Sequence, residues 1–279
     1  MRVIVGVSGG VDSSVAALLL LRAGHDVAAL FMKNWEDDDT GSFCSAAADY
    51  QAARAACEVL EIPLFATNLA HAYRQRVFSE FLDGYRRGET PNPDVLCNRE
   101  IKFEAFWTEA QALGAEKMAT GHYARLIDGP TGMMLGRSRD LQKDQTYFLS
   151  RVRHDQLQRV LFPLASHTKA EVRALAREAG LPNHDRPDST GICFIGERQF
   201  RPFLRRYLAP RPGPIHAVDG RLLGQHEGLM YYTVGQRAGL GIGGPGGPWY
   251  VIDKLPAHNL LIAGGADEAA LYSRALWAA

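Results

Sequence analysis

The first half of the chain alternates short runs of apolar, β-branched residues with longer segments of helical periodicity. Residues 3–7 predict a buried strand that ends at a glycine-rich turn. The other predicted strands cover residues 27–32, 64–68 and 117–120, and the predicted helices cover residues 13–23, 45–60, 70–87, 101–113 and 168–179. Such alternation predicts an α/β fold, a doubly wound and mostly parallel sheet whose ligands lie at the carboxyl ends of the strands.

The pattern changes after residue 208. Residues 209–214 read Ala-Pro-Arg-Pro-Gly-Pro, which is typical of a linker, and the short β runs that follow predict a second, small β-rich domain. Asp219-Gly220 is a two-residue hairpin signal. The predicted strands of this part cover residues 215–218, 221–223, 231–234, 249–252 and 259–263. We therefore predict a catalytic domain over residues 1–208, the linker 209–214, the β-rich domain 215–265 and an unfinished stub over 266–279.

Composition narrows the class of protein. The 279 residues are 46% hydrophobic and 22% charged, with 31 basic and 31 acidic side chains, so any nucleic-acid site must be a local patch. The four cysteines (Cys44, Cys57, Cys97 and Cys193) form no C-x-x-C pair, which argues against a disulfide-stapled secreted domain and a zinc site. The start of the chain lacks a signal-peptide pattern, and the longest apolar run, residues 15–21, is too short to span a bilayer. We expect a cytoplasmic protein with no membrane partner.

Residues 6–13, Gly-Val-Ser-Gly-Gly-Val-Asp-Ser, are the most informative stretch. Glycines let backbone N–H groups approach an anion, and the helix that follows adds the positive end of its dipole. Ser8 and Ser13 can donate hydrogen bonds to phosphate, whereas Asp12 is expected to meet phosphate through Mg²⁺ or water. The loop lacks the G-K-[ST] ending of a Walker A motif. A plain turn with a good helix cap is the alternative interpretation.

A second glycine-rich stretch, residues 241–246, matches G-x-G-x-x-G only formally. It follows no convincing strand of a βαβ unit and opens no helix, and Pro245 favours a rigid turn. We predict no dinucleotide site there.

Two cysteines lie in polar motifs. Cys97 follows a proline-bounded loop and precedes a helix, whose N-terminus favours the thiolate. Cys193 precedes an arginine-rich segment, which acts in the same direction. The alternative for any free cysteine is a small buried apolar residue, and this interpretation fits Cys44 and Cys57 better.

The motif Ser-Gly-Gly-Val-Asp-Ser resembles the loop of the ATP pyrophosphatases, which cleave ATP between its α and β phosphates and transfer AMP to an oxygen. Five further stretches, T-P-N-P-D-V-L-C-N, A-T-G-H-Y, K-D-Q-T-Y-F-L, D-S-T-G-I-C-F-I-G-E-R and G-Q-R-A-G-L-G-I-G-G, are similar in order to motifs of the bacterial tRNA-specific 2-thiouridylase family. The resemblance runs from the first strand to about residue 263. It implies the PP-loop type of sheet, a tRNA-uridine 2-sulfurtransferase activity and a further C-terminal β-barrel beyond residue 279.

The resemblance implies that ATP adenylates the C2 oxygen of the wobble uridine in a tRNA anticodon. A persulfide on Cys193, loaded by a sulfur carrier protein, then delivers sulfur, and Cys97 completes the release through a transient disulfide. Asp94 is implied to contact the target base as a general acid or base, with a turn carboxylate after Pro93 as the alternative. Without the barrel, we expect intact ATP binding and weaker tRNA binding.

The implied ligands are ATP with Mg²⁺ and tRNA, with no protein-bound metal. The implied ATP-binding residues are Gly6, Val7, Ser8, Gly9, Gly10, Val11, Asp12, Ser13, Met32 and Gly121. The implied tRNA-binding residues are Asn92, Pro93, Asp94, His122, Lys143, Asp144 and Gln145.

Residues 191–215 carry five arginines and one acid, a net charge of +4. Phe200, Phe203, Leu204 and Tyr207 fall at helical spacing, which predicts that they face a core while the arginines face outward. Such arginines bind phosphates or form only a solvated basic face. Two other functions stay open: an adenylating ligase or amidotransferase with an amine nucleophile, and an inactive RNA-binding remnant.

Overall fold

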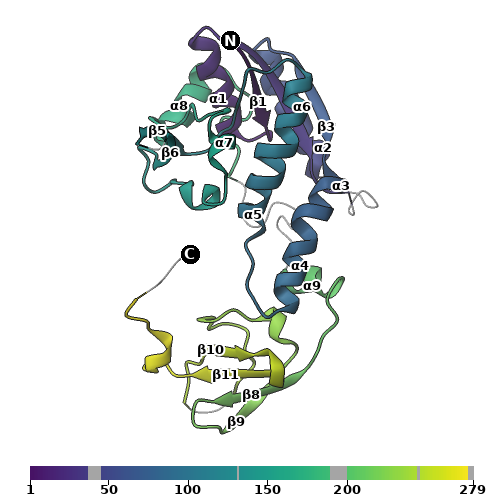
Figure 1. Cartoon of the computed structure of the whole chain (residues 1–279), viewed down its shortest axis with the longest axis vertical. Helices are drawn as coiled ribbons and strands as arrows, with labels where there is room; N and C mark the ends of the chain where they lie inside the picture. Colours follow the sequence, from purple (N-terminus) through teal and green to yellow (C-terminus); the bar gives the residue numbers. More distant parts are fainter. Residues whose placement is uncertain (37–44, 131, 189–199, 244–245, 276–279) are drawn as a thin grey trace. The chain divides into compact units, whose positions relative to one another are not determined.

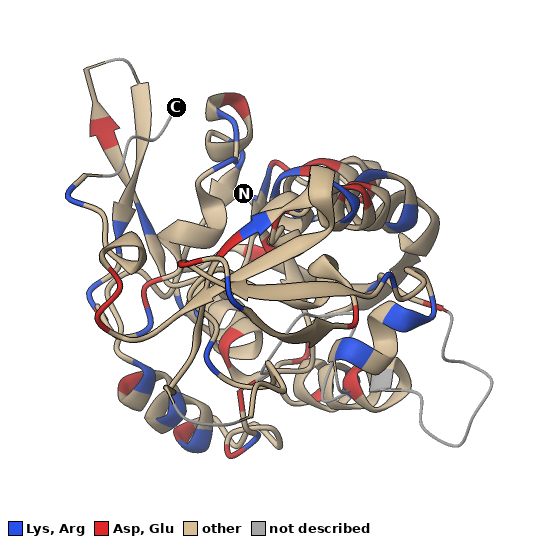
Figure 2. Ribbon diagram, turned by 90° about the horizontal axis from the view of Figure 1, so that it is seen from below, with Lys and Arg blue, Asp and Glu red and all other residues tan. Residues whose placement is uncertain are grey.

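The computed structural model describes the chain except for residues 37–44, 131, 189–199, 244–245 and 276–279 (Figure 1). Internal contacts divide it into two compact units, a first unit of Met1–Ser79 with Asn92–Gly196 and a second unit of Glu80–Pro91 with Glu197–Ala279. A segment from the first half of the chain thus contributes to the second unit. The ribbon in Figure 2, coloured by residue type, shows basic and acidic positions interspersed along the helices, as expected for a chain with no net charge.

The first unit is built on a five-stranded, all-parallel sheet with the order β3-β2-β1-β4-β7. Its strands are β1 (Arg2–Val7), β2 (Asp26–Lys33), β3 (Leu64–Asn68), β4 (Lys117–Ala119) and β7 (Val160–Leu161). Its longer helices include α1 (Val11–Arg22), α2 (Ser45–Val59), α6 (Phe106–Ala112) and α8 (Lys169–Glu178). The predicted parallel α/β sheet is confirmed.

The strand β1 shows why helices lie on both faces of this sheet. Val3, Val5 and Val7 belong to one buried cluster with side chains of α1, α2 and α8. Gly6 points to the opposite face, where a Cβ would lie 3.4 Å from the ring of Phe106 in α6. Side chains alternate between the faces of a strand, so a strand that is apolar throughout needs cover on both sides.

The helix that was predicted to begin at Ile101 begins eight residues earlier. The segments α5 (Pro93–Leu96), a π-helical stretch (Cys97–Ala105) and α6 follow one another without a break. Asn92 caps this helix, because its side chain accepts a hydrogen bond from the Asp94 amide at 3.0 Å and Pro93 occupies the first helical position. The predicted helix over residues 70–87 likewise consists of α3 (Ala70–Tyr73), a π-helical stretch (Arg74–Phe78) and α4 (Ser79–Arg86).

The sequence patterns missed an antiparallel hairpin between β4 and β7. It consists of β5 (Ala124–Gly129) and β6 (Gly132–Arg137). A short helix, α7 (His154–Leu157), follows it. Neither ARLIDG in β5 nor GMMLGR in β6 alternates regularly between apolar and polar residues, so the two-residue period is weak.

The second unit contains a four-stranded sheet with the order β10-β11-β8-β9. Its strands are β8 (Gly213–Ala217), β9 (Leu222–His226), β10 (Tyr250–Leu255) and β11 (Leu260–Gly264). The predicted Asp219-Gly220 hairpin is confirmed: β8 and β9 are antiparallel, and Gly220 has φ +88°. The predicted strand over residues 231–234 is wrong, because Leu229–Tyr231 forms a 3-10 turn and the Tyr231 hydroxyl donates to the Leu208 carbonyl at 2.7 Å.

The arginine-rich segment forms α9 (Phe200–Arg205) in the second unit. Phe203 and Leu204 are buried, which confirms that these side chains face a core. Arg205 is paired with Glu227 at 2.6 Å, so this arginine is not an unpaired outward cation. Of the stub predicted over residues 266–279, the described part contains a 3-10 turn, Ala269–Leu271.

Candidate active site

The turn between β1 and α1 can be made only by glycine at its centre. Gly9 has φ +79°, in the left-handed region. A Cβ on Gly9 would overlap the Asp49 carbonyl oxygen and would lie 2.8 Å from the Arg186 guanidinium. The backbone is thereby fixed in a tight concave turn that leads directly into the N-terminus of α1, the geometry of an anion site.

The two loop serines are hydrogen-bonded within the turn. The Ser13 hydroxyl accepts from the Ser8 amide at 3.2 Å and donates to the Gly10 carbonyl at 3.0 Å. The Gly10 amide donates to the Ser8 hydroxyl at 3.4 Å. The first amides of any α-helix lack intrahelical acceptors, so those at the start of α1 are the donors that this turn offers to an anion.

Two further residues that the family resemblance assigned to ATP lie at the same edge of the sheet. Met32 is near the carboxyl end of β2, directly after Phe31, which is in register with the last residue of β1. Gly121 follows β4, and a Cβ there would lie 2.7 Å from the Ser13 amide nitrogen. Only a residue without a side chain lets this segment pass so close to the first turn of α1.

Asp12, the carboxylate of the loop, is held by two partners. The Lys169 ammonium lies 2.7 Å and 2.8 Å from its two carboxylate oxygens, and the Tyr123 hydroxyl donates to it at 3.0 Å. Burial, followed by the negative charge of Asp12, raises the pKa of Tyr123 well above its usual range, so this hydroxyl stays protonated. The Lys169 side chain is only 12% exposed and also lies 2.6 Å from Asp188. Lys169 therefore bridges two carboxylates beside the phosphate turn.

Asp188 forms ion pairs with three cationic side chains. Besides Lys169, it pairs with Lys143 at 2.7 Å and with Arg173 at 3.4 Å. Burial alone would raise the pKa of Asp188, but the hydrogen bonds from Lys143 and Lys169 outweigh it and lower that pKa. Asp188 is the last residue described before residues 189–199, and Cys193 lies outside the described residues.

Sequence patterns missed three residues that hold the turn. Asn183, which is buried, donates to the Gly9 carbonyl at 3.0 Å, and Arg186 donates to the same oxygen at 3.1 Å and pairs with Asp49. Lys169 is the third. These three residues lie more than 150 positions after the phosphate turn. The one sequence signal that could have drawn attention to any of them was the Thr168 capping box, which places Lys169 at the first position of α8.

The thiol of Cys97 is 1% exposed at the start of the π-helical stretch. The same helix start presents Asn92, whose side-chain amide donates to the Tyr147 hydroxyl at 2.6 Å, and Asp94 in its first turn. Cys57 in α2 is also buried, and burial, followed by the charge of Glu58, raises its pKa to about 11. Cys57 thus behaves as the small apolar residue that the sequence predicted.

His122 follows β4 and is packed against the protein interior. Its Nδ1 lies 2.8 Å from the Thr120 hydroxyl, and its ring stacks on Phe103 with 6.0 Å between centroids. Burial, followed by the charge of Lys102, lowers the pKa of His122 well below its ordinary value. The imidazole is therefore neutral at physiological pH.

Lys143, Asp144 and Gln145 were predicted to bind tRNA, but not all three side chains are available to a ligand. The Asp144 carboxylate accepts from the Thr146 hydroxyl at 2.6 Å, and the Gln145 side chain accepts from the Tyr123 amide at 3.0 Å. These two side chains are engaged in local structure. Lys143, at 43% exposure, is the member of the triplet that faces solvent.

Among the described residues, no group of three or more His, Cys, Asp or Glu could hold a metal ion. In the same part of the chain, no helix is long and apolar enough to cross a membrane.

Comparison with known proteins agrees with this geometry. Residues 1–197 match the family described as tRNA methyl transferase HUP domain, and residues 201–265 match the tRNA methyl transferase PRC-barrel domain. A tRNA-specific 2-thiouridylase MnmA of Nitrosomonas eutropha is 54% identical and covers 100% of this chain and 78% of its own length. The MnmA of Methylococcus capsulatus is 55% identical and covers 99% of this chain and 76% of its own length.

Among solved structures, a 4-thiouridine synthetase in complex with RNA and bound ATP aligns with a TM-score of 0.44 at 18% identity. The alignment covers 74% of this chain and 49% of that one, a likeness too low to argue about function. The matches to the two 2-thiouridylases extend over virtually the whole chain. The chain belongs to the tRNA-specific 2-thiouridylase family.

Proposed function

We propose that this chain uses ATP to activate the C2 oxygen of a tRNA wobble uridine and replaces that oxygen with sulfur. The observation that carries the proposal is the glycine turn at Gly9, which leads into the N-terminus of α1 at the carboxyl edge of the parallel sheet. The relatives named above, at 54% and 55% identity, are named for 2-thiolation of tRNA. A turn of this kind binds the phosphates of ATP, and the named activity supplies the acceptor.

In the proposed ATP complex, the phosphates accept hydrogen bonds from the first amides of α1. Lys169 is the cation beside this turn, and its ammonium exchanges the carboxylate of Asp12 for a phosphate oxygen. Asp12 is then available to a Mg²⁺ ion. Because Mg²⁺ keeps several waters and binds one or two carboxylates together with substrate phosphates, a single loop carboxylate fits it.

The proposed chemistry has three steps. The C2 oxygen attacks the α-phosphorus of ATP, and pyrophosphate leaves. The terminal sulfur of a persulfide on Cys193, loaded by a carrier protein, attacks C2, and AMP leaves with the oxygen. The Cys97 thiolate then attacks the Cys193 sulfur, which releases 2-thiouridine and leaves a Cys97–Cys193 disulfide for a thiol reductant to reduce.

The helix start at Pro93 is the proposed base site. Asp94 lies in the first turn, and Cys97 follows it by three residues at the start of the π-helical stretch. Residues three apart lie on the same side of a helix, so the two side chains share one face. Since Cys97 is 1% exposed, we propose that this helix start shifts when the base binds.

An isotope experiment tests the activation step. A tRNA labelled with ¹⁸O at C2 of the wobble uridine is incubated with the chain, ATP and a persulfide donor, and AMP is analysed by mass spectrometry. The proposal predicts one ¹⁸O atom in each AMP formed. Unlabelled AMP would contradict activation of the C2 oxygen, and AMP formed with ammonia in place of sulfur would favour an amidotransferase.

A further inference from the structure

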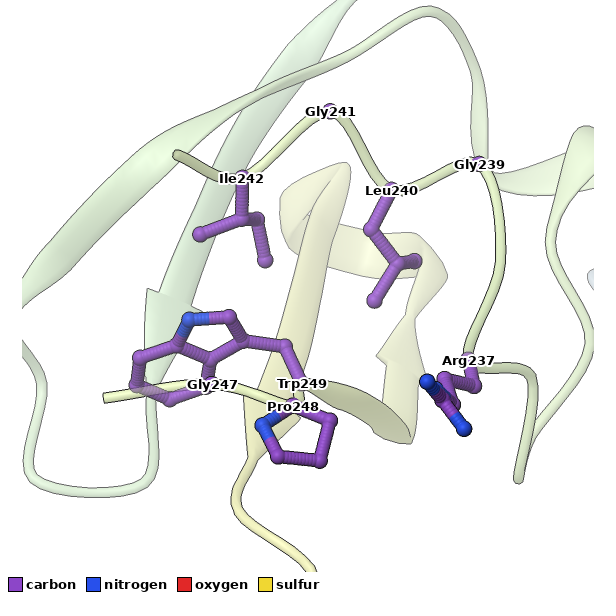
Figure 3. A pocket seen from close by; sticks show the side chains of 8 residues that line it. All are labelled: Arg237, Gly239, Leu240, Gly241, Ile242, Gly247, Pro248 and Trp249. Carbon is purple, nitrogen blue, oxygen red and sulfur yellow. The ribbon is translucent and has the colours of Figure 1, made fainter. Parts of the chain in front are cut away.

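The second unit contains a hollow of about 280 Å³ that the proposed catalytic steps do not use. Its lining includes Arg237, Leu240, Ile242, Pro248 and Trp249. Figure 3 shows Arg237 and Trp249 at opposite sides of the hollow, with the side chains of Leu240 and Ile242 directed into it. One cation therefore faces an apolar and aromatic wall across a small space.

Arg237 is an exposed arginine without a partner. Within the part of the chain that the structure describes, it makes no ion pair or side-chain hydrogen bond. Other arginines of the second unit are engaged: Arg205 pairs with Glu227 at 2.6 Å, and Arg201 donates to the Gly239 carbonyl at 3.0 Å. A guanidinium that presents its donors to solvent beside a hollow is suited to bind a phosphate.

Trp249 supplies the opposite wall. Its indole Nε1 is buried and has no hydrogen-bond partner among the described residues, and an unpaired buried donor costs about 1–3 kcal/mol. Gly246 packs closely on the ring, since a Cβ on this residue would lie 3.1 Å from it. The unpaired N–H is a donor that a ligand with an acceptor group can use.

Charge indicates the kind of ligand. Residues 201–265 hold seven Lys or Arg against three Asp or Glu, a net charge of +4 in a chain whose total is zero. A local positive excess of this kind attracts the phosphate backbone of nucleic acids. We propose that this hollow binds one unpaired nucleotide of the tRNA, with its phosphate on Arg237 and its base against Trp249. This inference rests on the proposed function, in which tRNA is the substrate.

The size of the hollow agrees with a single nucleotide. Its volume of about 280 Å³ lies just below the range of about 300–1,000 Å³ that is usual for small-molecule pockets, and it is too small for a dinucleotide cofactor. Sequence-tolerant binding of an RNA base commonly uses an aromatic side chain with an arginine on the phosphate. This arrangement gives the lining glycines Gly239, Gly241 and Gly247 a role that needs no βαβ unit.

The test compares Arg237→Gln and Trp249→Phe with Arg274→Gln, a change of another exposed arginine of the second unit outside the hollow. Binding of an unmodified tRNA transcript is measured by fluorescence anisotropy over a series of salt concentrations. We expect Arg237→Gln to weaken binding about tenfold and to reduce the slope of log K against log salt by about 1. Arg237→Lys should restore most of that slope, and Arg274→Gln should change Kd less than twofold.

For Trp249→Phe we expect about threefold weaker binding and loss of the tryptophan fluorescence change that RNA causes in the unmodified chain. Unchanged Kd and salt slope in Arg237→Gln would overturn the proposal. Thiolation is assayed separately: thiolation with no effect of Arg237→Gln on binding rejects the hollow alone, whereas the predicted effect without thiolation rejects the proposed reaction alone. Absence of any RNA binding rejects both.

Discussion

At the scale of single residues, the phosphate turn is held by side chains that lie far from it in the sequence. The Lys169 ammonium contacts both carboxylate oxygens of Asp12, and the Asn183 side chain donates to the Gly9 carbonyl. The charge pair between Lys169 and Asp12 spans 157 positions, so it forms only when the folded sheet brings the two helix starts together.

The glycine turn can be tested with two alanine substitutions at nearly equal backbone angles. Gly9 and Gly24 have φ +79° and +78°, but only Gly9 has atoms within reach of an added Cβ. Gly24→Ala should lower the free energy of unfolding by about 1 kcal/mol and leave ATP binding unchanged. Gly9→Ala should lower the free energy of unfolding by more than Gly24→Ala does, and it should abolish ATP binding as measured by calorimetry. Equal effects of both changes would show that the overlap with Asp49 does not matter.

Lys169 should contribute directly to ATP binding. Lys169→Met removes the cation beside the turn. We expect it to lower the affinity for ATP at least tenfold in equilibrium binding, because a charge-assisted contact is lost. Lys143→Met is the matched control, because Lys143 pairs with the same Asp188 but not with Asp12. Its effect on ATP should stay within twofold. If both variants bind ATP like the unmodified chain, Lys169 is only structural.

The lowered pKa of His122 predicts a pH dependence of stability. Below the unfolded pKa of about 6.5, the unfolded chain binds a proton that the folded chain excludes, so the free energy of unfolding falls as pH falls. Each such histidine contributes up to about 1.4 kcal/mol per pH unit, and His226, whose pKa burial also lowers, contributes a second share. His122→Asn should reduce the slope between pH 5 and 6.5 in urea unfolding, and an unchanged slope would contradict a neutral buried imidazole.

At the scale of elements, periodicity predicted the strands better than the ends of helices. The strand over residues 64–68 has the predicted bounds, although as the edge strand β3 it is only partly covered and contains no fully buried residue. The helix at Pro93 was missed because proline and asparagine read as loop residues, although here they form its cap. Residues 231–234 were predicted as a strand because tyrosine, threonine and valine have high β-propensity. In the structure Tyr231 ends a 3-10 turn, so tertiary packing overrode that preference.

The cap of α8 offers a test at this scale. Thr168 accepts from the Glu171 amide at 3.3 Å, and Glu171 accepts from the Thr168 amide at 2.7 Å. Thr168→Ala should lower the free energy of unfolding by about 1 kcal/mol and weaken ATP binding slightly, because α8 positions Lys169. Ser166→Ala, at a nearby exposed serine, should change the free energy of unfolding by less than about 0.5 kcal/mol in the same urea titration.

At the scale of the whole molecule, the chain consists of two units, and the sequence predicted the class of each. It did not predict that Glu80–Pro91 contributes to the second unit, because such a contribution depends on contacts between distant segments. Whether the two thiols of the proposed reaction lie close together also could not be predicted from their spacing, because 96 positions separate them in the sequence. Cys97 lies in a helix of the first unit, and Cys193 lies outside the described residues.

The most direct test of the account is the yield of 2-thiouridine from unmodified tRNA, ATP and a persulfide donor, measured by nucleoside mass spectrometry. The account predicts 2-thiouridine in an amount equal to the AMP released. It also predicts that Cys193→Ser and Cys97→Ser abolish the product, while Cys57→Ser, at a buried thiol of α2, retains it. Undiminished 2-thiouridine from Cys193→Ser would contradict the account.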